Sequence, residues 1–192
     1  GLEALPSLFF EFHGTPSAVN EQARQAEEIA KGYGAQEFRW ATDAEERSRL
    51  WQARHDALWA ALATKPGYQG LATDAIVPVS RLDEAILGAK EDIAASGLSA
   101  PIVGHVGDGN FHTVILVPPE PDGLARAWEL DKKIVARALS LGGSCSGEHG
   151  VGIGKREFVL QEHGAEAVAV MRSIKQAFDP LGILNPGKLF LN

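Results

Sequence analysis

The chain has one cysteine, no long apolar run and no surplus of basic residues, and each shortage excludes a class of protein. Cys145 has no second cysteine to pair with, so the fold does not depend on an internal disulfide or on an oxidising compartment. No apolar stretch reaches the roughly 18 residues that a membrane-spanning helix needs. A formal net charge of -7 argues against a general nucleic-acid-binding surface, which requires Lys and Arg in excess. Binding or chemistry of a small molecule is the class of function that remains.

The composition and the patterning are those of a globular domain with strands and helices. Hydrophobic residues make up 45% of the chain and charged residues 22%, which excludes a disordered or fibrous protein. Apolar and alternating runs predict strands at 7–12, 36–40 and 74–79 and two more within 101–117. Helical spacing predicts helices at 17–32, 43–62, 81–96, 124–141 and 164–178. This order predicts an α+β fold with a ferredoxin-like antiparallel sheet covered by helices on one face.

The segment 104–112, Gly-His-Val-Gly-Asp-Gly-Asn-Phe-His, is the most informative part of the sequence. An Asp-Gly pair between apolar runs favours a tight hairpin. A hairpin centred on Asp108 and Gly109 places His105 directly opposite His112, and directly opposed residues have Cβ atoms roughly 5 Å apart. Two imidazoles at that separation can bind one metal ion. Taken alone, such a hairpin is more often a surface feature without metal, so this segment does not decide between the two interpretations.

A metal site that stays open to substrate needs a third protein ligand, and the best candidate is Glu148 in the glycine-rich segment 142–154. Two imidazoles and one carboxylate suit zinc or a first-row ion such as manganese, and the residue types do not choose between them. The glycines around Glu148 predict that this backbone passes close to another group, which is flavin, substrate or metal. The adjacent His149 is expected to point elsewhere.

Three segments in the same order, 104–112, 147–155 and 178–188, resemble the C-terminal domain of the FAD-linked oxidases of the vanillyl-alcohol-oxidase superfamily. The similarity also covers 73–82, so it extends over most of the chain from about residue 50 onward. It implies transfer of a hydride from C2 of a D-2-hydroxyacid to FAD, which yields a 2-ketoacid.

The same resemblance implies a division of tasks among four site residues. His105, His112 and Glu148 match the positions that hold a divalent metal, and this metal binds the hydroxyacid. His149 matches the general base that takes the hydroxyl proton. A Lewis acid lowers the pKa of a bound hydroxyl, and a nearby imidazole that titrates near neutrality accepts its proton.

The resemblance further implies residues that contact substrate and cofactor. Arg54 matches an arginine that binds the substrate carboxylate, which a guanidinium can grip through two parallel hydrogen bonds; without the resemblance it is a surface arginine of a helix. Asn110, Asn185 and Lys188 are the candidates for cofactor contact. The last two lie in a tail, 179–192, that family members fold back towards the flavin, although the turn after the last helix would use the same residues.

The resemblance concerns only part of an enzyme. Nothing in residues 1–192 resembles the glycine-rich pyrophosphate loop of the N-terminal domain that holds most of the FAD in this superfamily. We therefore expect the chain to be the C-terminal, substrate-capping part of a longer protein and to be inactive alone. The expected partners are that FAD-binding domain, a D-2-hydroxyacid and an electron acceptor such as a cytochrome or a quinone. A face left open by the missing domain would also allow a homodimer.

Two departures from the family narrow the substrate class. Similar D-2-hydroxyglutarate dehydrogenases tend to carry a Lys and an Asn for a second carboxylate where this chain has Ala72 and Val114. Because an apolar pair cannot compensate a second buried charge, a short monocarboxylate such as D-lactate or glycolate fits better. The segment 72–82 most resembles the cytochrome-type D-lactate dehydrogenases. The alternatives are the FAD subunit of a glycolate oxidase and a metal- or small-molecule-binding module without redox chemistry. The expected location is the cytoplasm, the inner face of a membrane or an organelle interior.

Overall fold

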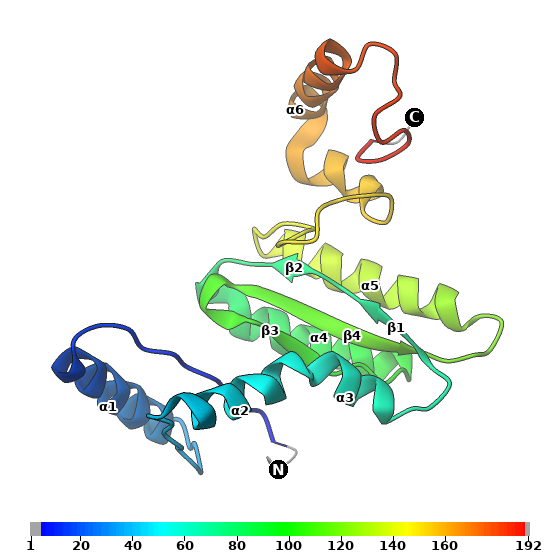
Figure 1. Ribbon diagram of the computed structural model, residues 1–192. Coiled ribbons are helices and arrows are strands. Elements are labelled where there is room, and N and C mark those ends of the chain that lie inside the picture. Colours follow the sequence, from blue (N-terminus) through cyan, green and yellow to red (C-terminus); the bar gives the residue numbers. More distant parts are fainter. Residues whose placement is uncertain (1–4, 191–192) are drawn as a thin grey trace. The chain divides into compact units, whose positions relative to one another are not determined.

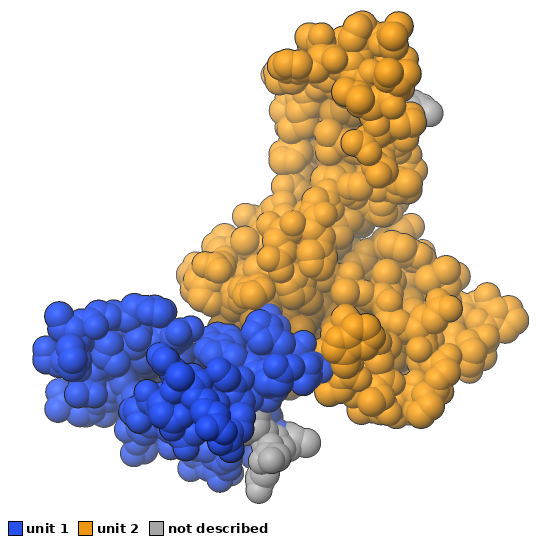
Figure 2. Space-filling view, in the orientation of Figure 1, with its two compact units in different colours: residues 1–56 blue, residues 57–192 orange. Residues whose placement is uncertain are grey.

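A computed structural model describes residues 5–190, and the chain divides into two compact units, Gly1–Asp56 and Ala57–Asn192 (Figure 2). The first unit contains helices α1 (Pro16–Gly32) and α2 (Ala44–His55) and connecting segments without regular structure. Asp43 caps α2 by accepting two backbone amide hydrogen bonds of 2.9 Å, as the sequence pattern predicts.

The strands predicted at 7–12 and 36–40 do not form, and this part of the prediction was wrong. Both segments have the apolar composition of strands, but within residues 5–56 no other segment pairs with their backbones. A strand is stable only when a neighbouring strand satisfies its amides and carbonyls, so local composition is not sufficient. The single helix predicted over 43–62 is interrupted at Asp56, where α2 ends.

The second unit is built around one long strand, β4, to which all other strands are antiparallel (Figure 1). Its elements are α3 (Ala57–Ala63), β1 (Gln69–Ala72), β2 (Ala75–Ile76), the 3-10 turn η1 (Val79–Arg81), α4 (Leu82–Ser96), β3 (Ile102–His105), the 3-10 turn η2 (Val106–Asp108), β4 (Asn110–Val117), α5 (Gly123–Ser140) and α6 (Arg156–Phe178). Strands β1 and β2 pair with successive parts of one side of β4, and β3 pairs with the other side.

The order of these elements is the ferredoxin-like one that the sequence predicts. Strands β1 and β2 act as one interrupted edge strand, α4 connects them to β3, β4 lies in the middle, and α5 follows. After α5 the chain returns beside β2 as a single bridge between Ile76 and Ser144, where a full ferredoxin-like unit has its last strand. The predicted α+β class is confirmed.

Strand β4 is buried along its whole length and separates two layers. Its odd-numbered residues Phe111 and Ile115 belong to the main core, which α4 and α5 cover. Its even-numbered residues Val114 and Leu116 pack against the short helix α3, which adds cover on the opposite face (Figure 1). Because side chains alternate along a strand, His112 lies on this second face, away from the main core.

Helix α6 begins earlier than predicted, at Arg156, and its backbone is non-helical at Gly164, where the sequence analysis had the helix begin. The first turn of α6 contacts α5 through a small cluster that contains Val135, Cys145 and Phe158. Among the residues that the structure describes, no helix is both long enough and apolar enough to cross a bilayer.

Candidate functional site

The two histidines of the hairpin lie on the same face of the sheet, but not in the predicted register. Residue His105 pairs with Asn110, and His112 pairs with Val103, so the predicted direct opposition of the two histidines was wrong. The pairing is shifted by two residues, and a shift of two keeps every side chain on its face. His105 and His112 are therefore diagonal neighbours, with ring centroids 6.0 Å apart.

The register differs because the connection is longer than a two-residue turn. A type I′ turn would need positive φ at both Asp108 and Gly109, and only Gly109 has it, with φ +79°. The chain instead forms the 3-10 turn η2 before Gly109. Val77 holds this turn in place, because its amide donates to the Gly109 carbonyl over 3.0 Å. A Cβ at position 109 would lie 2.0 Å from the Val77 carbonyl oxygen, so a glycine is required there.

A backbone carbonyl fixes the orientation of His112. Its ring is almost fully buried, and Nδ1 lies 3.0 Å from the carbonyl oxygen of Thr73. A carbonyl can only accept, so Nδ1 carries the proton of this bond and Nε2 of the neutral ring keeps its lone pair. This nitrogen faces Glu148, whose Oε1 is 3.0 Å away. A histidine held in this way presents the nitrogen that metal ions bind.

Glu148 completes a group of three donor atoms that could hold one metal ion. Its Oε1 is 3.5 Å from His105 Nε2 and 3.0 Å from His112 Nε2, and all three atoms lie within 4.8 Å of one another. Ligands about 2.0–2.2 Å from a shared ion in tetrahedral or octahedral geometry are roughly 2.8–3.6 Å apart, which matches these two separations. His105 and Glu148 are half-exposed, so the site opens to solvent on one side.

The ring of His149 lies beside this group without completing it. It stacks on His112 with centroids 5.0 Å apart and an angle of 11° between the planes, and its Nε2 is 4.0 Å from Glu148 Oε1. Half of this side chain is exposed. An imidazole so placed can exchange a proton with a molecule bound at the three donor atoms.

Asp74, which the sequence analysis treated only as part of a strand, is the central acceptor of the site. Its Oδ2 accepts from the Ser146 hydroxyl at 2.8 Å and from the amides of Glu148 and His149 at 2.9 and 2.8 Å. Its Oδ1 accepts from the Asn110 side-chain amide at 2.8 Å. Burial raises the pKa of this carboxyl, but these hydrogen bonds outweigh burial and hold the pKa well below the ordinary 3.8. An acidic residue inside an otherwise apolar strand pattern was the signal in the sequence.

A second group of potential ligands, formed by Asp74, His112 and His149, is a poorer metal site. The oxygens of Asp74 already accept four hydrogen bonds, and Nδ1 of His112 is engaged with Thr73. The donor set of His105, His112 and Glu148 therefore fits a metal better.

Behind the site lies a buried polar network that also escaped the sequence analysis. The ammonium of Lys155 donates to the backbone carbonyl of Asp74. Asp131, on α5, is 2% exposed and has no hydrogen-bond partner for either carboxylate oxygen among the described residues. Burial raises the pKa of Asp131, while the Lys155 charge lowers it by less; burial also lowers the pKa of Lys155. Burial raises the pKa of the Cys145 thiol to about 12, so this thiol stays protonated near neutral pH.

The other predicted site residues lie in three different places. Asn110 is buried, and its side-chain amide donates to Asp74 and to the Ala75 carbonyl. Asn185 and Lys188 are exposed after α6, with Lys188 Nζ 3.3 Å from Asn185 Oδ1. Residues 191–192 of the predicted tail lie outside the described residues. Arg54 is a half-buried residue in the last turn of α2, in the other unit, and makes no salt bridge with a described residue.

The glycine at position 147 is required by a close approach. A Cβ there would lie 1.8 Å from the side-chain nitrogen of Asn110 and 2.9 Å from Asp74 Oδ1. The backbone at Gly147 thus passes close to another group, but that group is the protein's own Asp74 and Asn110 side chains, whereas the sequence predicted flavin, substrate or metal.

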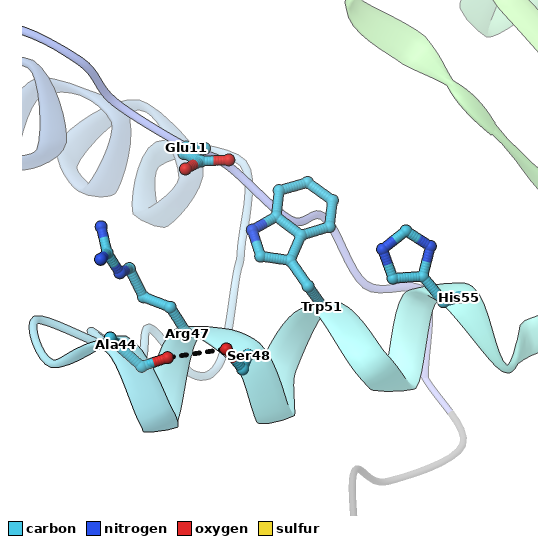
Figure 3. Close-up of a pocket in the computed structure, with 6 residues that line it drawn as sticks. All are labelled: Glu11, Ala44, Arg47, Ser48, Trp51 and His55. Carbon is cyan, nitrogen blue, oxygen red and sulfur yellow. Dashed lines mark hydrogen bonds between the residues drawn. The ribbon is translucent and has the colours of Figure 1, made fainter.

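The first unit has a shallow hollow of its own, between α2 and the extended segment that carries Glu11 (Figure 3). Trp51, His55 and Arg47 point from α2 towards it, and Ser48 is turned back to the Ala44 carbonyl. None of the predicted site residues lines this hollow, and its side chains do not form a donor set for a metal.

Comparison with known proteins gives one family and consistent relatives. The family model described as "FAD linked oxidases, C-terminal domain" matches residues 2–189. A probable mitochondrial D-lactate dehydrogenase of Danio rerio is 45% identical over 185 residues, which are 96% of this chain and 37% of the relative. A mitochondrial D-lactate dehydrogenase [cytochrome] of Arabidopsis thaliana is 42% identical over 98% of this chain and 33% of the relative. The glycolate oxidase subunit GlcD of Escherichia coli is 35% identical over 97% of this chain and 37% of the relative. The chain thus spans about a third of the length of these relatives.

Proposed function

The chain belongs to the family of the FAD linked oxidases, C-terminal domain, and from this premise we propose that it is the substrate- and metal-binding part of a flavin-dependent D-2-hydroxyacid dehydrogenase. The single observation that carries the proposal is the convergence of His105, His112 and Glu148 from two segments that are distant in the sequence. Relatives named as D-lactate dehydrogenases and as a glycolate oxidase subunit support the reaction class.

In this proposal His105, His112 and Glu148 hold a zinc or manganese ion. The ion would supply a Lewis acid for the hydroxyl and carboxylate oxygens of the substrate. The half-exposed side of the cluster leaves coordination positions open, which a catalytic site requires and a structural site does not. The buried His112 would supply a ligand from the sheet, and the half-exposed His105 would supply a second ligand from the start of the hairpin turn.

His149 is proposed to accept the hydroxyl proton as the C2 hydride leaves for the flavin, so that the hydroxyacid becomes a 2-ketoacid. Its ring lies next to the donor atoms, and its exposure lets the proton pass on to water. Arg54 is proposed to bind the substrate carboxylate, because a guanidinium can grip a carboxylate through two parallel hydrogen bonds and Arg54 makes no salt bridge with the residues that the structure describes.

The flavin is the expected hydride acceptor of this family, and most of its binding residues belong to a domain outside residues 1–192. Asn185 and Lys188, which are exposed, remain our candidates for contact with it. Asn110 also remains a candidate, although its side chain is engaged with Asp74. A cytochrome acceptor is proposed by analogy with the relatives named as cytochrome enzymes, and a quinone is the alternative.

D-lactate is the substrate we propose, with glycolate as the second candidate. Ala72 and Val114, which the sequence analysis contrasted with residues that bind a second carboxylate, are direct partners across β1 and β4. Val114 occupies the next even position after His112 on the same face of β4. An apolar cross-strand pair beside the metal ligands offers nothing to a second carboxylate, which favours a substrate with one. The mitochondrial relatives favour an organelle interior over the other expected locations.

The test uses the full-length protein that contains this chain and its flavin-binding domain. We expect D-lactate to bleach the flavin absorbance without oxygen, and His149→Gln to slow this reduction by at least about 100-fold. His163→Gln is the matched control, because His163 is a partly exposed histidine of the same unit outside the cluster. Faster reduction by glycolate would favour the glycolate oxidase alternative. No reduction by any 2-hydroxyacid would favour a binding module without redox chemistry.

A further inference from the structure

We propose that Asp74 is a positioning residue that sets Glu148 and His149 in place for their roles, an inference that rests on the proposed function. The observation behind it is the set of hydrogen bonds that end on one buried carboxylate. Oxygen Oδ2 of Asp74 accepts from the backbone amides of both Glu148 and His149, and from the hydroxyl of Ser146 in the same segment. Asp74 is 1% exposed, so water does not compete for these bonds.

The segment that carries Glu148 and His149 has little else to fix it. It belongs to no helix or strand, and both side chains are half-exposed. Gly150 and Gly152 follow with positive φ and no contact at their Cβ positions, and the next backbone hydrogen bonds of the segment are accepted only at Val151 and Gly152. Without an anchor, ordering these residues would cost about 1–2 kcal/mol each in conformational entropy.

Asp74 is itself held from behind. It lies between β1 and β2, and the buried Lys155 donates to its backbone carbonyl while the Asn110 amide donates to its Oδ1. The preceding residue, Thr73, accepts from Nδ1 of His112 through its carbonyl oxygen. The dipeptide Thr73-Asp74 therefore controls the orientation of His112 and the placement of the Glu148 segment at the same time.

This arrangement explains how two distant segments produce one donor set. The 3.0 Å separation between His112 Nε2 and Glu148 Oε1 depends on two anchor points that are adjacent in the chain. Movement of the Glu148 segment by about 1 Å would separate the donor atoms beyond the range that a shared ion accepts. Asp74 thus acts through its neighbours and does not contact the reacting atoms.

The experiment compares Asp74→Asn with Asp92→Asn. The second variant is a matched control, because Asp92 accepts two hydrogen bonds from Arg137, of 3.0 and 2.8 Å, in the same unit but away from the site. Three quantities are measured on the purified chain: unfolding in urea, the affinity for Zn²⁺ or Mn²⁺ added alone, by calorimetry, and amide hydrogen exchange at Glu148 and His149, by NMR. We expect Asp74→Asn to weaken metal binding about 10- to 100-fold and to accelerate exchange at both amides, while Asp92→Asn changes affinity less than about threefold.

The outcomes separate this inference from the proposed function. If the parent chain binds neither ion, the metal proposal fails, and amide exchange still tests Asp74. If Asp74→Asn is folded and leaves exchange at Glu148 and His149 unchanged, the positioning role is wrong whatever the metal result. If Asp74→Asn does not fold, the Ser146→Ala variant is measured instead, because it removes one hydrogen-bond donor to Oδ2 and keeps the carboxylate. Amide exchange at Glu148 and His149 that is at least about threefold faster supports the positioning role. Unchanged exchange at both amides overturns it.

Discussion

Replacing each hairpin histidine by alanine should separate metal binding from stability. Both His105→Ala and His112→Ala remove one of three proposed ligands, but the two side chains differ in burial. The side chain of His105 is 50% exposed, whereas that of His112 is 10% exposed and bonded to the Thr73 carbonyl. A surface truncation costs about 0.5 kcal/mol or less in the free energy of unfolding. The buried substitution, His112→Ala, leaves the Thr73 carbonyl unpaired, which costs about 1–3 kcal/mol, and also leaves a cavity. We therefore expect the free energy of unfolding to fall by about 3–4 kcal/mol.

The metal adds a second difference that can be calculated. An ion present at 100 times its Kd stabilises the folded parent by about 2.7 kcal/mol. If losing a ligand raises Kd about 100-fold, the same concentration stabilises either variant by only about 0.4 kcal/mol. Urea unfolding with and without Zn²⁺ or Mn²⁺ measures both terms. Without metal, His105→Ala should unfold at nearly the same urea concentration as the parent, and His112→Ala should unfold at a much lower one. With metal, both variants should lack most of the stabilisation that the metal gives the parent.

Two results would refute this reasoning. One is an His105→Ala variant that keeps the full stabilisation by metal, because then His105 is not a ligand. The other is a metal-free His112→Ala variant that is as stable as His105→Ala, because then the bond to Thr73 does not hold the ring. His163→Ala, in the same unit, should change neither quantity.

Three further substitutions test the surroundings of the site, each by melting temperature. Gly147→Ala forces a Cβ to within 1.8 Å of the Asn110 side chain and should destabilise the chain by at least about 1–3 kcal/mol; a neutral effect would show that the segment can move aside. Glu162→Gln should lower the melting temperature near neutral pH but not in acid. Burial raises the pKa of Glu162, but hydrogen bonds led by the one from the Cys145 amide lower it below 4.5. The ionised Glu162 therefore stabilises the fold fully above pH 4.5, and this stabilisation is lost as the pH falls through the lowered pKa. Asp131→Asn should show the opposite dependence on pH, because burial raises the pKa of Asp131 above 3.8. The parent loses stability as the pH rises through the raised pKa, so the variant should gain stability relative to the parent from about pH 4 upward. A difference in melting temperature that does not change with pH would contradict this assignment.

The hairpin shows how far local pattern reaches. Face assignment depends only on whether the register is odd or even, so the prediction that His105 and His112 share a face is confirmed although the register was wrong by two. The length of the turn depends on Val77, which is distant in the sequence and donates a hydrogen bond to the Gly109 carbonyl. The residue types at Asp108 and Gly109 give no sign of that contact, so the sequence predicts the shorter, two-residue turn.

The incorrect strands at 7–12 and 36–40 have a related cause. Apolar alternation states that a segment is suited to a sheet, but it does not supply the backbone that must pair with it. Within residues 5–56 no such partner is present, whereas β4 provides one for each of β1, β2 and β3. Helices satisfy their own backbones, and accordingly α1, α4 and α5 were predicted nearly to their ends.

Asp74 was missed for a third reason, which concerns the physics of the site more than its pattern. Residues that carry chemistry are recognised by type, and the histidines and Glu148 were found in that way. Asp74 has the same residue type as a ligand, yet its oxygens are filled by donors from the segment it holds. Only coordinates show whether a carboxylate faces outward to a ligand or inward to amides. The distinction has a chemical consequence, because a carboxylate in permanent contact with amides stays ionised and gives direction to a glycine-rich segment. A half-exposed Glu148 can then retain a fixed position, which combines access for a substrate with the geometric definition that a bound ion requires.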